Sequence, residues 1–183
     1  MDPKFSIDHP DAAARTVIAQ ARELTRAYNT AAPGDAAARR RILEALLGGL
    51  GEDVAIDTPF FCDYGKNIFL GSHIIININC TFIDTARITV GDHVLIASNV
   101  QIYTATHAPE AADRIFPGET PWFRTYTAPV TIEDGVWIGG GAILLPGVTI
   151  GRNSVIGAGS VVTRSIPDGC VAVGNPCRPI RKL

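Results

Sequence analysis

One histidine is the residue best suited to chemistry. His107 ends the polar run Tyr103–His107, where an aliphatic pattern that fills much of the chain breaks off. A free imidazole has a pKa of about 6.5, so it is largely unprotonated near neutral pH. Such a group can remove the proton of a hydroxyl nucleophile, which accelerates a reaction by typically about 10²–10⁴-fold. The alternative is a polar loop histidine bonded to a backbone carbonyl, and the residue type alone does not decide between them.

The pattern that ends at this histidine is a repeat with a period of six residues. Between positions 132 and 162 the repeated aliphatic residues are Ile132, Ile138, Leu144, Ile150, Ile156 and Val162. Neither an isolated helix nor an isolated strand has this period, so it indicates a repeat architecture. Six residues suit one short extended segment followed by a tight corner. Three segments per turn then predict a triangular prism of parallel strands, which is a parallel β-helix.

The same repeat occurs earlier in the chain, interrupted by two extra residues near Asp84–Thr85. Three pairs should stack one coil apart: Leu70 with Val90, Ile76 with Ile96, and Phe82 with Ile102. The extra residues then lie within about 5 Å, one strand spacing, of the corner that leads to His107. We therefore expect Asp84 to orient the imidazole or to bind an acceptor hydroxyl. The alternative is a corner aspartate bonded to its own backbone.

The remaining elements flank the repeat. Segments 11–28 and 35–47 have helical apolar spacing, with Asp35 as an N-cap and Gly48-Gly49 as a stop. Repeat proteins need capping elements, so we expect a cap at 1–52, a β-helix at 53–169 and a tail at 170–183. The loop 103–129 interrupts the β-helix, and a loop of this length is usually functional.

Composition excludes several classes of protein. The chain has 183 residues, 46% of them hydrophobic, and a formal net charge of −2, so no basic excess suggests nucleic acid. Its apolar runs are too short to cross a bilayer, and its first residues do not read as a secretion signal. Cys62, Cys80, Cys170 and Cys177 form no CxxC pair, which favours reduced thiols in a cytoplasmic protein over disulfides or a metal site.

Four segments carry a resemblance to a known family: 21–29 in the first helix, Cys-Asp-Tyr-Gly at 62–65, Val-Trp-Ile-Gly at 136–139, and 155–163. With the repeat and the loop, they make nearly the whole chain resemble the hexapeptide-repeat acyltransferases. The most similar branch contains the maltose, galactoside and nodulation O-acetyltransferases. The resemblance implies a left-handed β-helix and a homotrimer with intersubunit active sites. It also implies direct acetyl transfer from acetyl-CoA to a hydroxyl of a sugar or sugar-like acceptor, without a metal.

The resemblance also assigns roles around the catalytic base. It places the base at His107 and a nearby loop glutamate at Glu119, although a charged loop residue is often only solvated. Arg114 aligns with a loop arginine and should pair with Glu119 or anchor the loop.

Acceptor-binding positions of the family fall on Asp63, Asn77 and Thr85. Galactoside-type enzymes have a carboxylate where this chain has Thr85, which puts the identity of the acceptor in doubt. The family's opening segment has no counterpart here, so Asp11 is a candidate for the contact that the cap normally makes. Asn77 could equally belong to a ladder of corner asparagines that only satisfies backbone groups.

Donor-binding positions lie further along the chain: Trp137, Gly139, Gly140, Ala158, Thr163, Arg164, Arg178 and Arg181. The small residues would let an extended pantetheine arm approach the backbone, and the arginines suit the phosphates of coenzyme A. Trp137 would stack near the donor. The alternative is structural, because tight corners demand small residues and a basic tail is commonly only solvated.

Other interpretations remain open. His73 and His93 should be neighbours one coil apart and could hold a metal, although a third histidine ligand is missing. A non-catalytic β-helix scaffold is another possibility. Within acetyltransferases, the acceptor could be an antibiotic alcohol, a serine or an amino sugar.

Overall fold

Three parallel sheets form the walls of a prism in the computed structural model, which describes residues 6–8, 12–119 and 122–183. The first wall contains β2 (Gly49–Leu50), β5 (Ile68–Leu70), β8 (Ile88–Val90), β13 (Val130–Ile132) and β16 (Thr149–Ile150). The second contains β3 (Val54–Ile56), β6 (Ile74–Ile76), β9 (Leu95–Ile96), β14 (Trp137–Ile138), β17 (Val155–Ile156) and β19 (Cys170–Val173). The third contains β4 (Phe60–Cys62), β7 (Cys80–Ile83), β10 (Gln101–Tyr103), β15 (Ile143–Leu144) and β18 (Val161–Val162).

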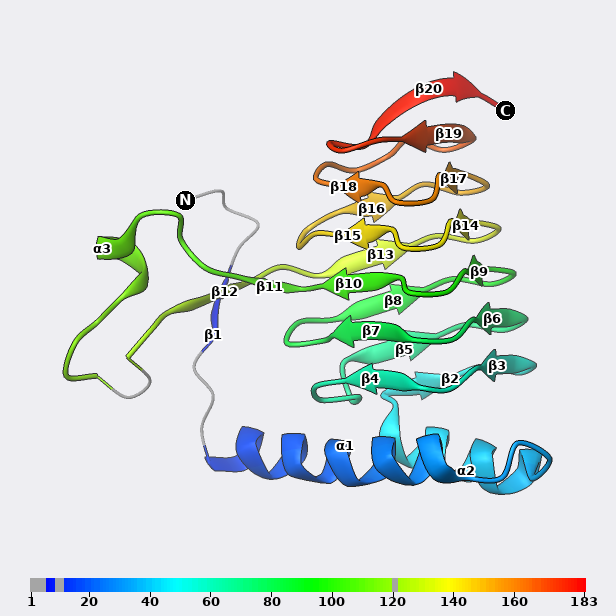
Figure 1. Cartoon of the computed structure of the whole chain (residues 1–183), viewed down its shortest axis with the longest axis horizontal. Coiled ribbons are helices and arrows are strands. Elements are labelled where there is room, and N and C mark those ends of the chain that lie inside the picture. The colour runs from blue at the N-terminus through cyan, green and yellow to red at the C-terminus, as the bar shows by residue number, and fades with distance from the viewer. Residues whose placement is uncertain (1–5, 9–11, 120–121) are drawn as a thin grey trace.

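The chain visits the walls in a fixed order as it winds from the helices toward the C-terminus. In Figure 1 the strands of the near wall, such as β7 and β10, run leftward, and those of the far wall, such as β8, run rightward. This winding is left-handed, the rare hand for a connection between parallel strands. The prediction of a left-handed parallel β-helix is confirmed.

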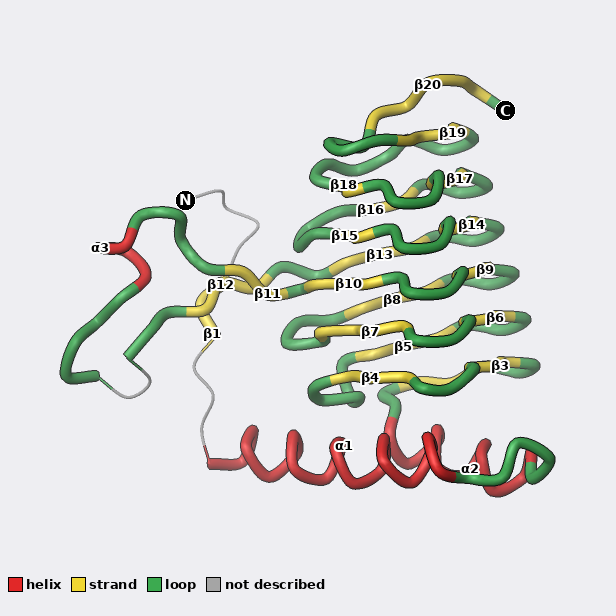
Figure 2. The backbone as a smooth tube through the Cα atoms, in the orientation of Figure 1, coloured by secondary structure: helices red, strands yellow, loops and turns green. Residues whose placement is uncertain are grey.

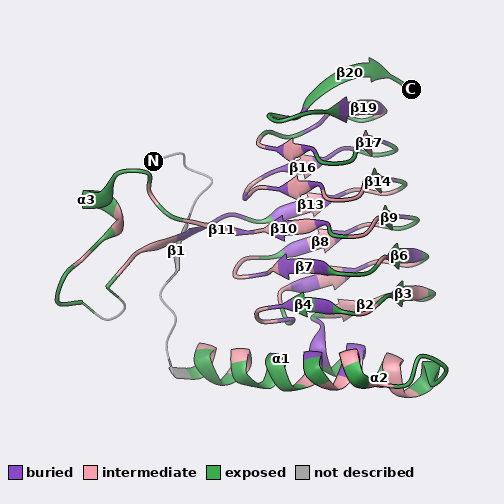
Figure 3. Ribbon diagram, viewed as in Figure 1, coloured by how far each residue is buried: buried purple, intermediate pink, exposed green. Residues whose placement is uncertain are grey.

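Stacked aliphatic side chains fill the prism. The registers pair Leu70 with Val90, Ile76 with Ile96, and Phe82 with Ile102, as the spacing predicts. Figure 2 shows that the strands are short and separated by turns, and Figure 3 shows that they combine buried residues with intermediate or exposed ones. Full burial of one such side chain stabilises the fold by about 1.5–3 kcal/mol.

Two helices cover one end of the coil, α1 (Ala12–Thr30) and α2 (Ala36–Leu46) (Figure 1). The Asp35 carboxylate accepts a hydrogen bond from the Ala38 amide at 3.0 Å, which confirms it as an N-cap. The Tyr28 hydroxyl donates to the Ile56 carbonyl at 2.6 Å and thereby ties α1 to the first coil. The predicted helical cap is therefore present.

The C-terminal tail differs from the expectation. Ile166 bridges to Ile150, and β19 pairs in parallel with β17, so the coil continues past Pro167. β20 (Arg178–Lys182) then folds back antiparallel onto β19. Proline and cationic residues on such an edge strand discourage pairing with another chain, so β20 closes this end of the coil.

The segment 103–129, which we call the arm, leaves the coil sideways (Figure 1). β11 (Ala105–Thr106) pairs antiparallel with β12 (Thr125–Thr127), and β1 (Ser6–Asp8) pairs with the other edge of β12. α3 (Ala111–Arg114) lies beyond this small sheet. The arm therefore has an ordered base. None of the helices in the described segments is long and apolar enough to span a bilayer.

Candidate functional site

The arm starts from one corner of the prism, where the chain passes from the third wall to the first. We call this corner, formed by residues 63–67, 84–87 and 104–107, the arm corner. Cys62 pairs with Phe82, and Ile83 pairs with Tyr103, so the turns that follow β4, β7 and β10 lie one above another. Asp63, Thr85 and His107 are thereby brought to the same edge of the molecule.

Thr104 sets the direction in which the arm leaves. Its hydroxyl donates to the Ile83 carbonyl at 2.7 Å and accepts a hydrogen bond from the Ala86 amide at 2.8 Å. The Ala128 amide donates to the Thr104 carbonyl at 2.9 Å, which closes the base of the arm. Sequence reasoning missed Thr104. Its signal was present, because Thr104 occupies the position that Asp84 occupies one coil earlier.

The imidazole of His107 is exposed and is contacted by two residues that directly precede β12 in the arm. Nδ1 lies 2.9 Å from the Arg124 carbonyl oxygen, and the ring meets Phe123 edge to face at a centroid distance of 5.6 Å. A carbonyl can only accept a hydrogen bond, so Nδ1 carries the proton and Nε2 carries the lone pair. The bond to a backbone carbonyl is thus compatible with a general base.

Asp84 does not orient this ring. Its Oδ1 accepts hydrogen bonds from the amides of Asp63 at 3.0 Å and Tyr64 at 2.9 Å, on the preceding coil. Its Oδ2 is buried and has no partner among the described residues. Burial raises the pKa of this carboxyl group to about 6, against the opposing effect of the amide hydrogen bonds. The geometry gives the orienting role to the Arg124 carbonyl.

The two loop residues assigned by resemblance behave differently. Glu119 is exposed, and its amide donates to the Phe116 carbonyl at 3.2 Å. Arg114 donates through Nη1 to the carbonyls of Ala108 at 2.6 Å and Pro109 at 2.9 Å. Arg114 therefore anchors the segment that follows His107, which was one of the two expectations for it.

Asp63 faces a groove of about 460 Å³ between α1 and β4. Burial raises the pKa of its carboxyl group, and the nearby charge of Arg22 opposes that shift. Asn29 holds β4 beside the groove, because its side chain donates to the Phe60 carbonyl at 2.9 Å and accepts from the Phe60 amide at 3.0 Å. The groove is a suitable size for a small polar ligand at the foot of the arm corner.

The other acceptor candidates are more scattered. Thr85 is half-buried in the β7–β8 turn, beside Asp84. Asn77 lies at a different corner, where its Oδ1 accepts from the Ile78 amide and the Ser98 hydroxyl, both at 2.8 Å. In the first of these bonds Asn77 satisfies a backbone amide of its own corner, as in the structural alternative considered above. Asp11 lies outside the described residues.

Half of the donor candidates lie at or just before the corner between the second and third walls. We call its turns, residues 97–99, 139–141 and 157–159, the glycine corner. Trp137 is 52% exposed on the second wall, just before this corner. A Cβ on Gly139 would lie 2.6 Å from the Ala158 amide nitrogen, so glycine is required there for coil packing. A Cβ on Gly140 would lie 3.3 Å from the Ser98 carbonyl oxygen, so this position is packed less tightly than Gly139.

The remaining donor candidates lie toward the C-terminal end. Thr163 and Arg164 follow β18, and Arg164 is exposed. Arg178 and Arg181 lie on β20, where the Arg178 guanidinium donates to the Cys177 carbonyl at 2.7 Å. Three exposed arginines thus lie toward this end of the coil, on different walls.

The histidine pair forms an exposed stack. The rings of His73 and His93 are 4.8 Å apart at 6°, and His73 Nδ1 lies 3.2 Å from an Asp53 carboxylate oxygen. Within the described residues, no cluster of three or more His, Cys, Asp or Glu side chains is arranged to hold a metal ion.

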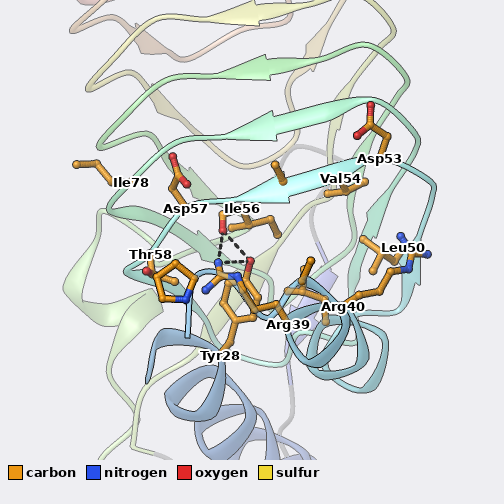
Figure 4. A pocket seen from close by; sticks show the side chains of 14 residues that line it. Tyr28, Arg39, Arg40, Leu50, Asp53, Val54, Ile56, Asp57, Thr58 and Ile78 are labelled. Atoms are coloured by element: carbon orange, nitrogen blue, oxygen red, sulfur yellow. Dashed lines mark hydrogen bonds between the residues drawn. The ribbon is translucent and has the colours of Figure 1, made fainter. Parts of the chain in front are cut away.

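A larger groove, of about 540 Å³, follows the seam between the helical cap and the first coil (Figure 4). Arg39 donates to the Tyr28 hydroxyl at 2.7 Å and to the Ile56 carbonyl at 2.8 Å. Arg40 is bonded to Glu44 at 2.9 Å and to the Gly51 carbonyl at 2.9 Å. These guanidinium groups join the cap to the coil, so the seam is structural.

The coil, its helical cap and the histidine at a long arm define a class, the capped hexapeptide β-helix. A family model described as "Bacterial transferase hexapeptide (six repeats)" matches residues 129–164. Another, described as "Maltose acetyltransferase hexapeptide capping motif", matches residues 13–51. Both matches fall on the elements predicted from the repeat and from the cap.

Individual proteins agree with this class. A putative acetyltransferase of Saccharomyces cerevisiae is 47% identical over 156 residues, which cover 85% of this chain and 76% of the relative. The galactoside O-acetyltransferase of Escherichia coli is 40% identical over 156 residues, covering 85% and 74%. A hexapeptide-repeat acetyltransferase of Vibrio cholerae, solved in complex with acetyl coenzyme A, superposes with a TM-score of 0.88 at 39% identity, covering 96% and 92%. The chain belongs to the hexapeptide-repeat acetyltransferase family, and the resemblance in its sequence is confirmed.

Proposed function

We propose that this protein transfers the acetyl group of acetyl-CoA to a hydroxyl group of a sugar or sugar-like acceptor, with His107 as general base. Membership of the family makes it an acetyl-CoA-dependent acetyltransferase. The observation that carries the histidine mechanism is the bond from Nδ1 to the Arg124 carbonyl, 2.9 Å long. It leaves the Nε2 lone pair available for the proton of an acceptor.

The chemistry follows from that tautomer. Nε2 of His107 takes the proton as the acceptor oxygen attacks the acyl carbon of the thioester. Backbone N–H groups are suited to stabilise the negative charge that develops on the carbonyl oxygen. The carbon–sulfur bond then breaks, and the imidazolium returns its proton to the leaving sulfur. Acetyl-CoA supplies the activated acyl group, and the acceptor leaves as its acetyl ester.

A covalent acyl-enzyme is not needed for this route. The four cysteines are buried and free. Burial raises the pKa of the Cys62 thiol to about 12, with a smaller contribution from the Asp84 carboxylate, so Cys62 is protonated and unreactive near neutral pH. We therefore infer direct transfer within a ternary complex.

The complete site is proposed to contain two chains. The strands of the third wall run from the glycine corner to the arm corner, so His107 lies at the opposite edge of this wall from the donor candidates Gly139, Gly140 and Ala158. A cyclic assembly would place the arm corner of one chain against the glycine corner of the next. A homotrimer of this kind has three equivalent clefts, each with His107 from one chain and Trp137, Gly140 and Ala158 from its neighbour.

Binding roles follow the same geometry. We assign the phosphates of coenzyme A to Thr163, Arg164, Arg178 and Arg181, and the pantetheine arm to the glycine corner. Asp63 and Thr85 would bind the acceptor on the arm corner, and Asn77 would reach it from the neighbouring chain. Glu119 is proposed as a further carboxylate near the acceptor. Thr85 supplies a hydroxyl in place of a carboxylate, so the enzyme is expected to accept a range of sugars different from that of galactoside-type relatives.

The acceptor class is tested by a thiol-release assay with acetyl-CoA and a panel of glycosides, amino sugars, serine and hydroxylated antibiotics. We expect the highest kcat/KM with a glycoside. The variant His107→Ala should reduce kcat by at least about 10²-fold with the same glycoside. Turnover that survives this substitution would remove His107 from the mechanism. Faster release with a non-sugar acceptor would replace the proposed acceptor class.

A further inference from the structure

A buried carboxylate braces the arm corner from inside. Asp84 has no exposed surface, and its Oδ1 bonds the amides of Asp63 and Tyr64 on the preceding coil at 3.0 and 2.9 Å. Asn67, at the end of the same turn as Asp63, bonds the two coils in the opposite direction. Its Nδ2 donates to the carbonyls of Asp84 at 2.7 Å and Thr85 at 3.2 Å. The two turns that carry the acceptor candidates Asp63 and Thr85 are therefore bonded to each other at four points.

We propose that Asp84 is a positioning residue whose carboxylate holds Asp63 at the acceptor groove without itself touching the acceptor. The inference rests on the proposed function, because it gives Asp63 a role in acceptor binding. Both amides that Asp84 bonds belong to the turn on which the Asp63 side chain enters the groove between α1 and β4. Since Oδ2 is buried and unpartnered within the described residues, direct contact between Asp84 and a ligand is not available.

The charge of Asp84 opposes folding, which argues that the brace serves binding. Its pKa is raised to about 6 from an ordinary value of 3.8, chiefly by burial. A group with a raised folded-state pKa binds its proton more tightly in the folded than in the unfolded protein. Above about pH 6 the ionised carboxylate therefore lowers the stability of the folded state, and protonation of Asp84 at lower pH removes this loss of stability. Charge-assisted hydrogen bonds to the two amides are stronger than neutral ones, so the ionised form holds the turn more firmly.

The effect of pH on other titratable groups near Asp84 must be distinguished from the titration of Asp84 itself. Cys62 and Asp63 lie on the preceding coil, and Tyr64 follows them. The Cys62 thiol has a pKa near 12 and stays neutral. Asp63 has a pKa raised by burial and titrates in its own right. The informative quantity is therefore the ratio of acceptor KM between a variant and the wild type at each pH, because the contribution of Asp63 is common to both.

Asp92 offers a matched control. Its Oδ1 also accepts a hydrogen bond from an amide of the preceding coil, that of Ser72 at 2.8 Å. Asp92 is exposed and lies at the corner between the first and second walls, away from the arm. The substitution Asp92→Asn changes the same kind of cross-coil bond at a corner with no proposed binding role.

The experiment compares Asp84→Asn, Asp84→Ala and Asp92→Asn in the full chain from pH 5 to 9, using the glycoside identified by the panel. For Asp84→Asn at pH 8 we expect acceptor KM to rise about fivefold, the effect of losing the charge assistance, with acetyl-CoA KM within twofold of wild type. The ratio to wild type should approach one below about pH 6, where wild-type Asp84 is protonated. Tm at pH 8 should not fall, and Asp92→Asn should leave both KM values unchanged.

Hydrogen exchange keeps this test independent of the sugar. In Asp84→Ala the amides of Asp63 and Tyr64 should exchange at least about tenfold faster than in wild type, because both lose their acceptor. Wild-type exchange rates at these amides, or wild-type acceptor KM in both Asp84 variants, would overturn the positioning role. If no glycoside is acetylated, the proposed function fails, and the exchange rates still decide whether Asp84 holds the turn.

Discussion

A single backbone carbonyl decides which nitrogen of His107 can act as a base. Arg124 directly precedes β12 in the arm, and its carbonyl oxygen, 2.9 Å from Nδ1, fixes the proton on that nitrogen. Phe123 meets the same ring edge to face. In the proposed mechanism, the reactivity of the histidine depends on the folding of the arm, and residues that hold the arm should affect turnover without touching the acceptor.

Arg114 is the clearest such residue. The substitution Arg114→Ala removes both hydrogen bonds to the carbonyls of Ala108 and Pro109, which follow His107 directly. We expect kcat to fall by about tenfold, because small misplacement of a catalytic group is costly, while Tm stays within a degree of wild type. Steady-state kinetics and calorimetry measure the two effects.

Arg152→Ala is the control for this prediction. Arg152 is a surface arginine paired with Asp134 at 2.6 Å, outside the arm. It should leave kcat unchanged. An Arg114→Ala enzyme with full kcat would show that the arm keeps its conformation without this anchor.

At the scale of elements, the junction between the cap and the coil is the most constrained connection. A Cβ on Gly48 would lie 2.1 Å from the Lys66 carbonyl oxygen, a backbone atom that cannot move aside easily. The Lys66 ammonium donates to the Leu47 carbonyl at 3.1 Å and holds the same junction from outside. The end of α2 and the start of the first wall are thus fitted closely together.

Substitution of Gly48 should therefore weaken the whole protein. We expect Gly48→Ala to destabilise the fold by roughly 1–3 kcal/mol, the usual effect of overpacking, and to lower Tm by several degrees. Gly34→Ala is the matched control, because a Cβ on Gly34 meets nothing within 4 Å. It should be neutral or slightly stabilising. Thermal unfolding followed by circular dichroism distinguishes the two, and equal Tm values would contradict the steric argument.

The coil and the cap could be predicted from sequence because their signals are periodic. An aliphatic residue at every sixth position fixes both the wall and the stacking partner, and Asp35 with Gly48 marks the ends of α2. The strand β19 was assigned to the tail, whereas the turn that contains Pro167 leads into a further strand of the coil. Proline there is accommodated since it precedes the strand rather than interrupting it.

The site could be predicted only in part. Residue type and resemblance propose His107 and Asp63, and the stacking register places Asp84 at the same corner as both. The partners of Asp84 and His107 are backbone amides and a carbonyl, which carry no mark in the sequence. The arm has no periodic pattern, so β11, β12 and α3 could not be anticipated.

At the scale of the whole molecule, the proposed trimer predicts complementation between two inactive chains. His107→Ala removes the base, and Ala158→Trp should block the glycine corner, where Ala158 is exposed and can be enlarged without disturbing the core. If each cleft uses His107 of one chain and Ala158 of its neighbour, unfolding and refolding an equal mixture should restore about one quarter of wild-type activity.

Each variant refolded alone should stay inactive, which is the control for this prediction. Activity is measured by thiol release and assembly by light scattering. A mixture that assembles into trimers yet remains inactive would place both groups of a cleft on the same chain. A protein that remains monomeric would end the two-chain site altogether.

The clasp at the base of the arm, where the Ala128 amide donates to the Thr104 carbonyl at 2.9 Å, has an evolutionary consequence. Because the two ends of the arm are neighbours, its sequence can be lengthened, shortened or replaced by that of a related protein without altering the register of any strand in the coil. Selection can thus change the ligand that the protein recognises by replacing the arm, while the coil stays constant.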